Sequence, residues 1–150
     1  MKKSILSIAL LPLFLFVVHF AKAQSGDTFV LSGWVKHIPD NLPGAKVVLY
    51  TEGANEAAGQ ELQSATADRK GKFELNLSFD SNYMVEISKE GYETKRIVMD
   101  THVPQASAHP KSFTFVANLN PAPDKGVAPA DPVKVFFDPA KKQFDYELPK

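Results

Sequence analysis

Histidine is the first residue type to examine for chemistry, because its imidazole can act as a general base or bind zinc. Apart from His19, which lies in an apolar run, the chain has His37, His102 and His109. A zinc site or a base and nucleophile pair needs groups that converge in space. No histidine here has a second ligand at the close spacing typical of such sites, so we expect solvated loop histidines.

Oxygen and sulfur ligands give no stronger signal for a metal. The candidate calcium ligands are Asp68, Asp80, Asn82 and Asp100, which could act together only if the ends of their strands meet. No EF-hand loop is present. The absence of cysteine excludes a thiolate zinc site, a cysteine nucleophile and a disulfide framework. We therefore expect no metal.

Paired carboxylates and a serine nucleophile are the two other catalytic patterns that the residue types allow. Glu52, Glu56 and Glu61 could form a pair of carboxylates for acid and base catalysis, but they fall in a small, polar stretch typical of a solvated loop. Serine catalysis would need an oriented histidine and carboxylate, and the chain has no Gly-x-Ser-x-Gly elbow. The sequence therefore predicts no enzymatic activity and no cofactor.

Aromatic rings remain as candidates, because sugars stack on exposed rings and protein interfaces are anchored by tryptophan and tyrosine. Trp34, Tyr50 and Tyr92 lie in patterns that favour the core. A second group belongs to a short C-terminal hairpin, which cannot bury four rings within itself; its members are Phe136, Phe137, Phe144 and Tyr146. Some of these must cover either a sheet edge of the same chain or a partner that adds a strand.

The first 23 residues have the three parts of a secretory signal peptide. Two lysines precede an apolar run over 5–20, and small residues lead to a predicted cut between Ala23 and Gln24. The run is interrupted by Pro12 and is short for a membrane span of about 20 residues. We expect an exported protein, periplasmic or secreted, with no transmembrane segment after cleavage. Without a cysteine it is not a lipoprotein.

The remaining chain has the period of β-structure. Apolar residues recur mostly at every second position, which is typical of half-buried strands. The alternating segments are 73–79, 83–87 and 113–119, and the denser ones are 29–35, 47–50 and 97–99. Residues 52–63 predict an exposed loop or a single helical turn. The fold class is all-β.

Length and composition predict one domain. The chain has 150 residues, 44% of them hydrophobic, with 17 basic and 17 acidic side chains, so it lacks the positive excess of a nucleic-acid binder. We expect a body over 24–119, then a tail over 120–150. The tail combines a proline-rich connection with a hairpin formed by 133–137 and 143–146.

The turn and core residues of the body follow one another in a recognisable order. They are Gly33, Pro43, Gly44, Ala45, Asp68, Gly71, Phe73, Tyr83, Gly91 and Tyr92. Over residues 28–101 this pattern resembles the carboxypeptidase regulatory-like domain, a transthyretin-like (Ig-like) β-sandwich common in exported bacterial proteins. The resemblance implies seven or eight strands, no cofactor, and a non-catalytic role as a spacer, binding module or assembly element. Transthyretin-like hydrolases end in Tyr-Arg-Gly-Ser, whereas residues 147–150 read Glu-Leu-Pro-Lys.

Two functions follow from these observations, and a hydrolase is the third and least favoured alternative. The first is an envelope protein that binds another protein through a sheet edge or through the tail. The second is a carbohydrate-binding module of the same fold, in which a ring exposed on the 28–119 body would carry the affinity. The expected partner is therefore an envelope protein or a polysaccharide, and not a nucleic acid.

Overall fold

The computed structural model describes residues 27–122 and 131–149. Ten strands and one short 3-10 turn make up its secondary structure. They are β1 (Thr28–His37), β2 (Asp40–Asn41), β3 (Lys46–Glu52), η1 (Ala54–Glu56), β4 (Ala58–Thr66), β5 (Lys72–Ser78), β6 (Asn82–Ser88), β7 (Lys95–Asp100), β8 (Ser112–Asn118), β9 (Val133–Asp138) and β10 (Gln143–Glu147).

The smaller of the two sheets, sheet A, is built around β1. Strand β5 pairs antiparallel with β1 on one side, and β8 pairs parallel with it on the other. The two residues of β2 fold back on the end of β1. Along β1 the side chains alternate between buried and half-buried, because one face of the sheet covers the core and the other meets water.

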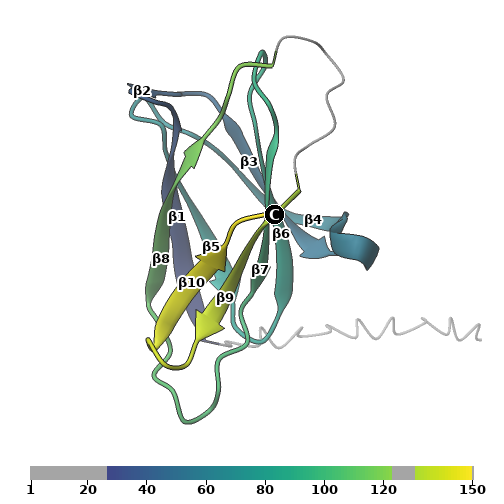
Figure 1. The fold of residues 1–150 in the computed structure, drawn as a ribbon, viewed down its shortest axis with the longest axis vertical. Coiled ribbons are helices and arrows are strands. Elements are labelled where there is room, and N and C mark those ends of the chain that lie inside the picture. The colour runs from purple at the N-terminus through teal and green to yellow at the C-terminus, as the bar shows by residue number, and fades with distance from the viewer. Residues whose placement is uncertain (1–26, 123–130, 150) are drawn as a thin grey trace, which may run out of the picture.

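The larger sheet, sheet B, has the order β10-β9-β7-β6-β3-β4. Its strands pair antiparallel, except that β9 runs parallel to β7. The C-terminal hairpin of β9 and β10 therefore extends sheet B beyond β7, and β10 lies beside β8 in Figure 1.

The core lies between the inner faces of the two sheets. Phe29 of β1 is 1% exposed and contacts two rings from later in the chain: Phe79, at a centroid distance of 4.9 Å, and Phe144, at 5.1 Å. Phe137 packs edge-on against Phe144 at 5.9 Å. Two of the four tail aromatics therefore belong to the core of the same chain, while Phe136 and Tyr146 are 39% and 59% exposed.

The predicted all-β sandwich is confirmed. Strands β1 to β8 form the body, and the predicted C-terminal hairpin, β9 and β10, adds two strands to sheet B. One detail of the prediction, over residues 52–63, is wrong. The predicted helical turn is present as η1, yet the loop expected up to residue 63 is a strand from Ala58 onward. Its polar side chains are exposed, and backbone pairing with β3 holds it in place, with register shifts that mark bulges.

The prediction that Trp34 lies in the core is wrong. It alternates with the buried residues of β1, so it lies half-buried on the outer face of sheet A. The predicted cleavage site, Ala23 and Gln24, lies outside the described residues, as does most of the proline-rich connection. In the described part of the chain, no helix is long and apolar enough to cross a membrane.

Candidate functional site

The three histidines make separate contacts, and His37 belongs to strand β1 and not to a loop. His37 at the end of β1 lies with Nδ1 3.2 Å from the carbonyl oxygen of Leu119. His102 forms a local pair with Asp100, Nδ1 to Oδ1 at 2.7 Å, and both side chains are more than half exposed. His109 lies 3.2 Å from the Asp27 carboxylate. These contacts fasten loops and strand ends, and they do not bring the histidines together.

The candidate calcium ligands are only partly brought together. Asn82 and Asp100 face each other as register partners of β6 and β7, with Asp80 in the preceding turn. Asp68 instead lies in the turn between β4 and β5. Within 27–122 and 131–149, no group of three or more histidine, aspartate or glutamate side chains is placed to hold a metal.

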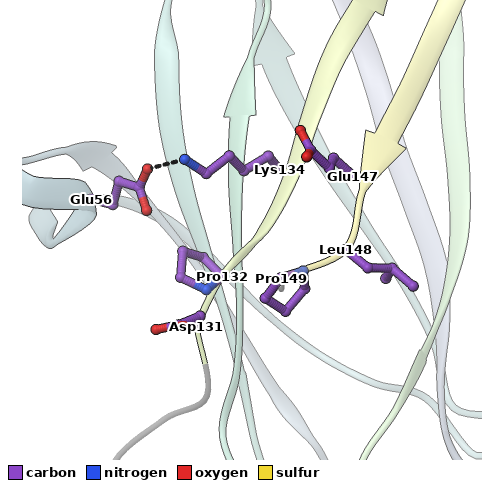
Figure 2. A pocket seen from close by; sticks show the side chains of 7 residues that line it. All are labelled: Glu56, Asp131, Pro132, Lys134, Glu147, Leu148 and Pro149. Atoms are coloured by element: carbon purple, nitrogen blue, oxygen red, sulfur yellow. Dashed lines mark hydrogen bonds and ion pairs between the residues drawn. The ribbon is translucent and has the colours of Figure 1, made fainter.

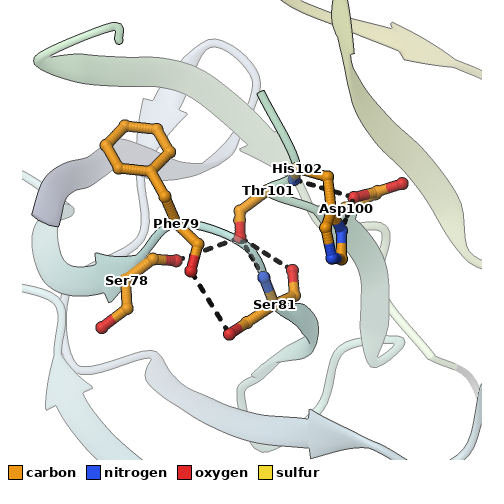
Figure 3. Close-up of polar contacts among 6 residues, drawn as sticks. All are labelled: Ser78, Phe79, Ser81, Asp100, Thr101 and His102. Carbon is orange, nitrogen blue, oxygen red and sulfur yellow. Dashed lines mark hydrogen bonds and ion pairs between the residues drawn. The ribbon is translucent and has the colours of Figure 1, made fainter. Parts of the chain in front are cut away.

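The turn next to Asp80 is held by a buried threonine (Figure 3). Thr101 is fully buried, and its Oγ1 donates to the carbonyl oxygens of Ser78 and Ser81, at 3.0 and 2.7 Å. The same oxygen accepts the backbone N–H of Ser81 at 3.0 Å. This network has a structural role, because it satisfies backbone groups that have left the strand ladder.

The residues that carried the family resemblance occupy turns and close contacts. A Cβ on Gly33 would meet the carbonyl oxygen of Phe115 at 2.6 Å and the Phe73 ring at 3.0 Å. Gly71 has a φ of +74° in the turn that Asp68 closes. The backbone N–H groups of Lys72 and Lys70 donate to Oδ1 of Asp68, and these bonds hold the pKa of Asp68 below its usual value.

A groove between β8 and β10 is the feature best suited to binding. It holds about 520 Å³ and is lined by residues of both sheets, from β8 of sheet A and from β7, β9 and β10 of sheet B. Apolar and aromatic side chains dominate its wall: Ile97, Phe113, Phe115, Val116, Val133, Val135, Phe144, Tyr146 and Leu148. Tyr146 and Leu148, which line the groove, are large apolar side chains that remain more than half exposed. Val116 is also exposed, but its side chain lies on the outer face of sheet A, at the rim of the groove. Exposed apolar surface that gathers in one concavity is typical of a binding site.

Strand β8 forms one rim of the groove and has a free edge. Within the described residues β8 pairs only with β1. The carbonyl of Lys111 and the N–H of Leu119 both bond to β1. The odd-numbered residues between them therefore direct their backbone N–H and C=O groups toward β1, within the plane of the sheet. The N–H and C=O groups of Ser112, Thr114, Val116 and Asn118 therefore face solvent.

The composition of β8 distinguishes it from the other sheet edges. Its sequence, Ser-Phe-Thr-Phe-Val-Ala-Asn, contains no charge, proline or glycine. By contrast, β5 carries Lys72 and Glu74, joined at 2.7 Å, β4 carries Glu61 and bulges, and β10 carries Asp145 and Glu147. Charges and bulges are the common means of blocking unwanted strand pairing. Of the edges described, β8 alone lacks both.

The opposite rim of the groove is held by an ion pair in the hairpin turn. Lys141 donates to the Asp145 carboxylate, which lowers the pKa of Asp145; the backbone N–H of Tyr146 adds to the same effect. The pair joins the turn to β10, the strand that positions Phe144 and Tyr146.

A smaller, charged pocket of about 370 Å³ adjoins this region (Figure 2). Glu56 of η1 reaches Lys134 of β9 at 2.5 Å and raises its pKa, while Glu147 and Asp131 complete the polar part of the lining. The ion pair spans from η1 to the hairpin. Of the three candidate carboxylates, Glu56 thus forms a structural ion pair. Glu61 is one of the groups that raise the pKa of Tyr50: burial of the phenol is the main cause, and the charges of Glu86 and Glu61 add to it.

Comparison with known proteins shows the fold alone. No known family and no curated protein matches this sequence. Among solved structures, a catechol 1,2-dioxygenase from Acinetobacter sp. ADP1 matches 77% of this chain and 60% of its own length, with a TM-score of 0.50 and 13% identity. A 3-chlorocatechol 1,2-dioxygenase from Rhodococcus opacus 1CP matches 67% of this chain and 62% of its own, with a TM-score of 0.48 and 14% identity.

A third structure with this β-sandwich likeness is a DUF3823 family protein from Parabacteroides merdae ATCC 43184. It matches 64% of this chain and 47% of its own length, with a TM-score of 0.43 and 15% identity. The chain spans about three fifths of the length of the two dioxygenases. Its fold and its groove therefore place this protein in the class of all-β sandwiches, and within the described residues one edge of the sandwich, β8, is open and uncharged.

The comparison corrects one prediction. The sequence predicts no enzymatic activity, in part because the family resemblance implies a non-catalytic role. That prediction is wrong as an exclusion, because a solved structure that shares the fold, at a TM-score of 0.50, is a catechol 1,2-dioxygenase. A fold hosts many functions, so the likeness removes the exclusion without assigning a reaction.

Sequence reasoning found part of the groove and missed the rest. Phe144 and Tyr146 were candidate interaction residues and line it, whereas Phe136 and Phe137 do not. The contribution of β8 was missed, although its alternation was recognised. The sequence does contain a signal for this edge. Residues 112–118 form an uncharged run with high β-propensity and without a charged residue or proline that would block strand pairing.

Proposed function

We propose that this chain is an exported β-sandwich module that binds other proteins by accepting an extended strand along β8. One observation carries the proposal: the free, uncharged edge of β8 borders an aromatic groove. A strand added there would bond to the outward backbone groups of Thr114 and Val116, while its alternate side chains would enter the groove. Backbone bonds would supply affinity and the groove would select side chains.

A peptide with the sequence of residues 111–119 tests strand acceptance, because it has the required alternation. We expect NMR shift changes at the amides of Thr114 and Val116 and at groove residues of the folded protein. Tyr146→Ala should weaken binding, whereas Ile38→Ala, which removes a 63% exposed side chain elsewhere, should not. Shift changes confined to β4 or β5 would contradict the proposal.

The export part of the proposal and the membership of the carboxypeptidase regulatory-like family rest on sequence. The signal-peptide pattern supports a cut between Ala23 and Gln24, and mass spectrometry of the protein from an envelope fraction would measure it. An N-terminus at Gln24 is expected. Intact residues 1–23 on the recovered protein would contradict export with cleavage.

Carbohydrate binding is a second candidate, favoured by Trp34. Its ring lies half-buried on the outer face of sheet A, beside the exposed Val116 of β8. A ring exposed on the body is what sugar stacking needs. Titration with soluble envelope polysaccharide should give binding that Trp34→Ala abolishes and Tyr146→Ala leaves intact. The reverse result would favour the groove.

A further inference from the structure

We infer that the strand accepted by β8 is the β8 of a second copy of this chain, paired antiparallel about a two-fold axis at Phe115. The inference rests on the proposed strand acceptance and names its occupant.

Charge distinguishes β8 from the other edges in self-pairing. In a two-fold antiparallel pair, each residue lies opposite a residue of the same strand, so a charged strand places like charges near one another. Strand β10 would bring Asp145 and Glu147 together with their copies. Strand β8 carries no charge, so its self-pairing has no such cost.

The direction of the backbone groups selects the register. The outward N–H and C=O groups belong to Ser112, Thr114, Val116 and Asn118. With the axis at Phe115, Thr114 lies opposite Val116 of the second copy, and Ser112 lies opposite Asn118. All four outward positions then find a partner, whereas an axis shifted along the strand leaves at least one outside the seven-residue overlap.

The groove supplies the apolar contribution. Residues opposite each other in an antiparallel pair project to the same face. The inner faces of both sheets A therefore lie on one side of the joined sheet, and the two grooves open toward each other. The exposed Tyr146 and Leu148 of each copy would then approach the second copy instead of water.

The test uses the chain from Gln24 to Lys150, which keeps every described residue. Analytical ultracentrifugation over a concentration series should show a dimer. Val116→Pro removes two intermolecular hydrogen bonds per dimer without removing a bond to β1, so the dissociation constant should rise at least about tenfold. The matched control is Glu74→Pro on the opposite edge of sheet A, which should dimerise like the parent. A dimer unchanged by Val116→Pro would overturn the inference.

Disulfide trapping tests the register independently of any proline. The chain has no cysteine, and the side chains of Thr114 and Val116 are both exposed. A mixture of Thr114→Cys and Val116→Cys should oxidise to a disulfide-linked heterodimer, because paired residues lie within the Cα separation that a disulfide spans. Each variant alone should crosslink much less. Equal crosslinking within either variant alone would overturn the register.

These outcomes separate the inference from the proposed function. A chain that stays monomeric up to the highest soluble concentration, but still shifts its β8 amides on adding the 111–119 peptide, would overturn the second-copy inference alone. A chain that neither dimerises nor binds the peptide would overturn strand acceptance as well.

Discussion

The rings of Phe29 and Phe144 stack with centroids 5.1 Å apart and planes 29° from parallel. One residue belongs to the first strand and the other to the last, and both are at most 4% exposed. The contact places the C-terminal hairpin in the same hydrophobic core as the body.

Phe144→Ala should therefore destabilise the whole sandwich. Removing a buried phenylalanine leaves a cavity, and we expect a loss of about 3–5 kcal/mol in the free energy of unfolding. Phe136→Ala, on the same hairpin but 39% exposed, should lose about 1 kcal/mol. Urea denaturation followed by Trp34 fluorescence measures both. Equal losses would mean that the hairpin does not share the core.

Asp68→Ala should lower stability in a pH-dependent way. The pKa of Asp68 is lowered in the folded state, chiefly by the N–H of Lys72 and then by that of Lys70. The ionised Asp68 carboxylate therefore adds to the free energy of unfolding at pH values above its pKa in the unfolded chain, and this stabilisation is lost as the pH falls through its pKa in the folded protein. Chemical denaturation should show a gap between parent and variant at pH 7 that narrows below about pH 4. A gap that widens in acid would contradict this sign.

Two glycines with positive φ should respond differently to alanine. At Gly91, with φ +83°, a Cβ meets nothing within 4 Å, so Gly91→Ala should cost about 1 kcal/mol for the left-handed backbone alone. At Gly71 a Cβ would lie 2.4 Å from the carbonyl oxygen of Val35, so Gly71→Ala should cost clearly more. Thermal denaturation of both variants compares the losses, and a larger loss at Gly91 would contradict the packing.

Thr101→Val should lower the free energy of unfolding, although valine and threonine have nearly the same shape. It would leave the N–H of Ser81 and the carbonyls of Ser78 and Ser81 without the hydroxyl that satisfies them (Figure 3). We expect a loss of about 1–3 kcal/mol. The same change at the exposed Thr66 is the control and should fall within about 0.5 kcal/mol of the parent. A Thr101 variant as stable as this control would contradict the network.

The strands could be predicted because their period is local. The alternation over 73–79 appears unchanged in β5, whose apolar residues are all buried. The sequence placed Trp34 wrongly in the core because residues 29–35 are rich in apolar side chains. In such a strand, only the pairing register with its neighbours decides which residues face inward. Ala58 to Gln63 has little β-propensity, and its strand depends on β3 as a neighbour.

The candidate site was harder to predict than the fold. The groove joins β8 and β10, which are adjacent in space but lie in different sheets. Local pattern does not encode such a relationship between distant strands. What the sequence does contain is the absence of charge over 112–118, which has meaning only once β8 is known to be an edge.

The parallel pairing of β1 with β8 bears on the order in which the molecule can fold. A chain emerging N-terminus first can join β1 to β5 once Ser78 is free, but the other side of β1 must wait for residue 118, and Phe29 must wait for Phe144. Loop closure over such separations is slow. During synthesis the first strand thus stays half-paired until residue 118 has appeared, and the aromatic part of the core is complete only once Phe144 has been made.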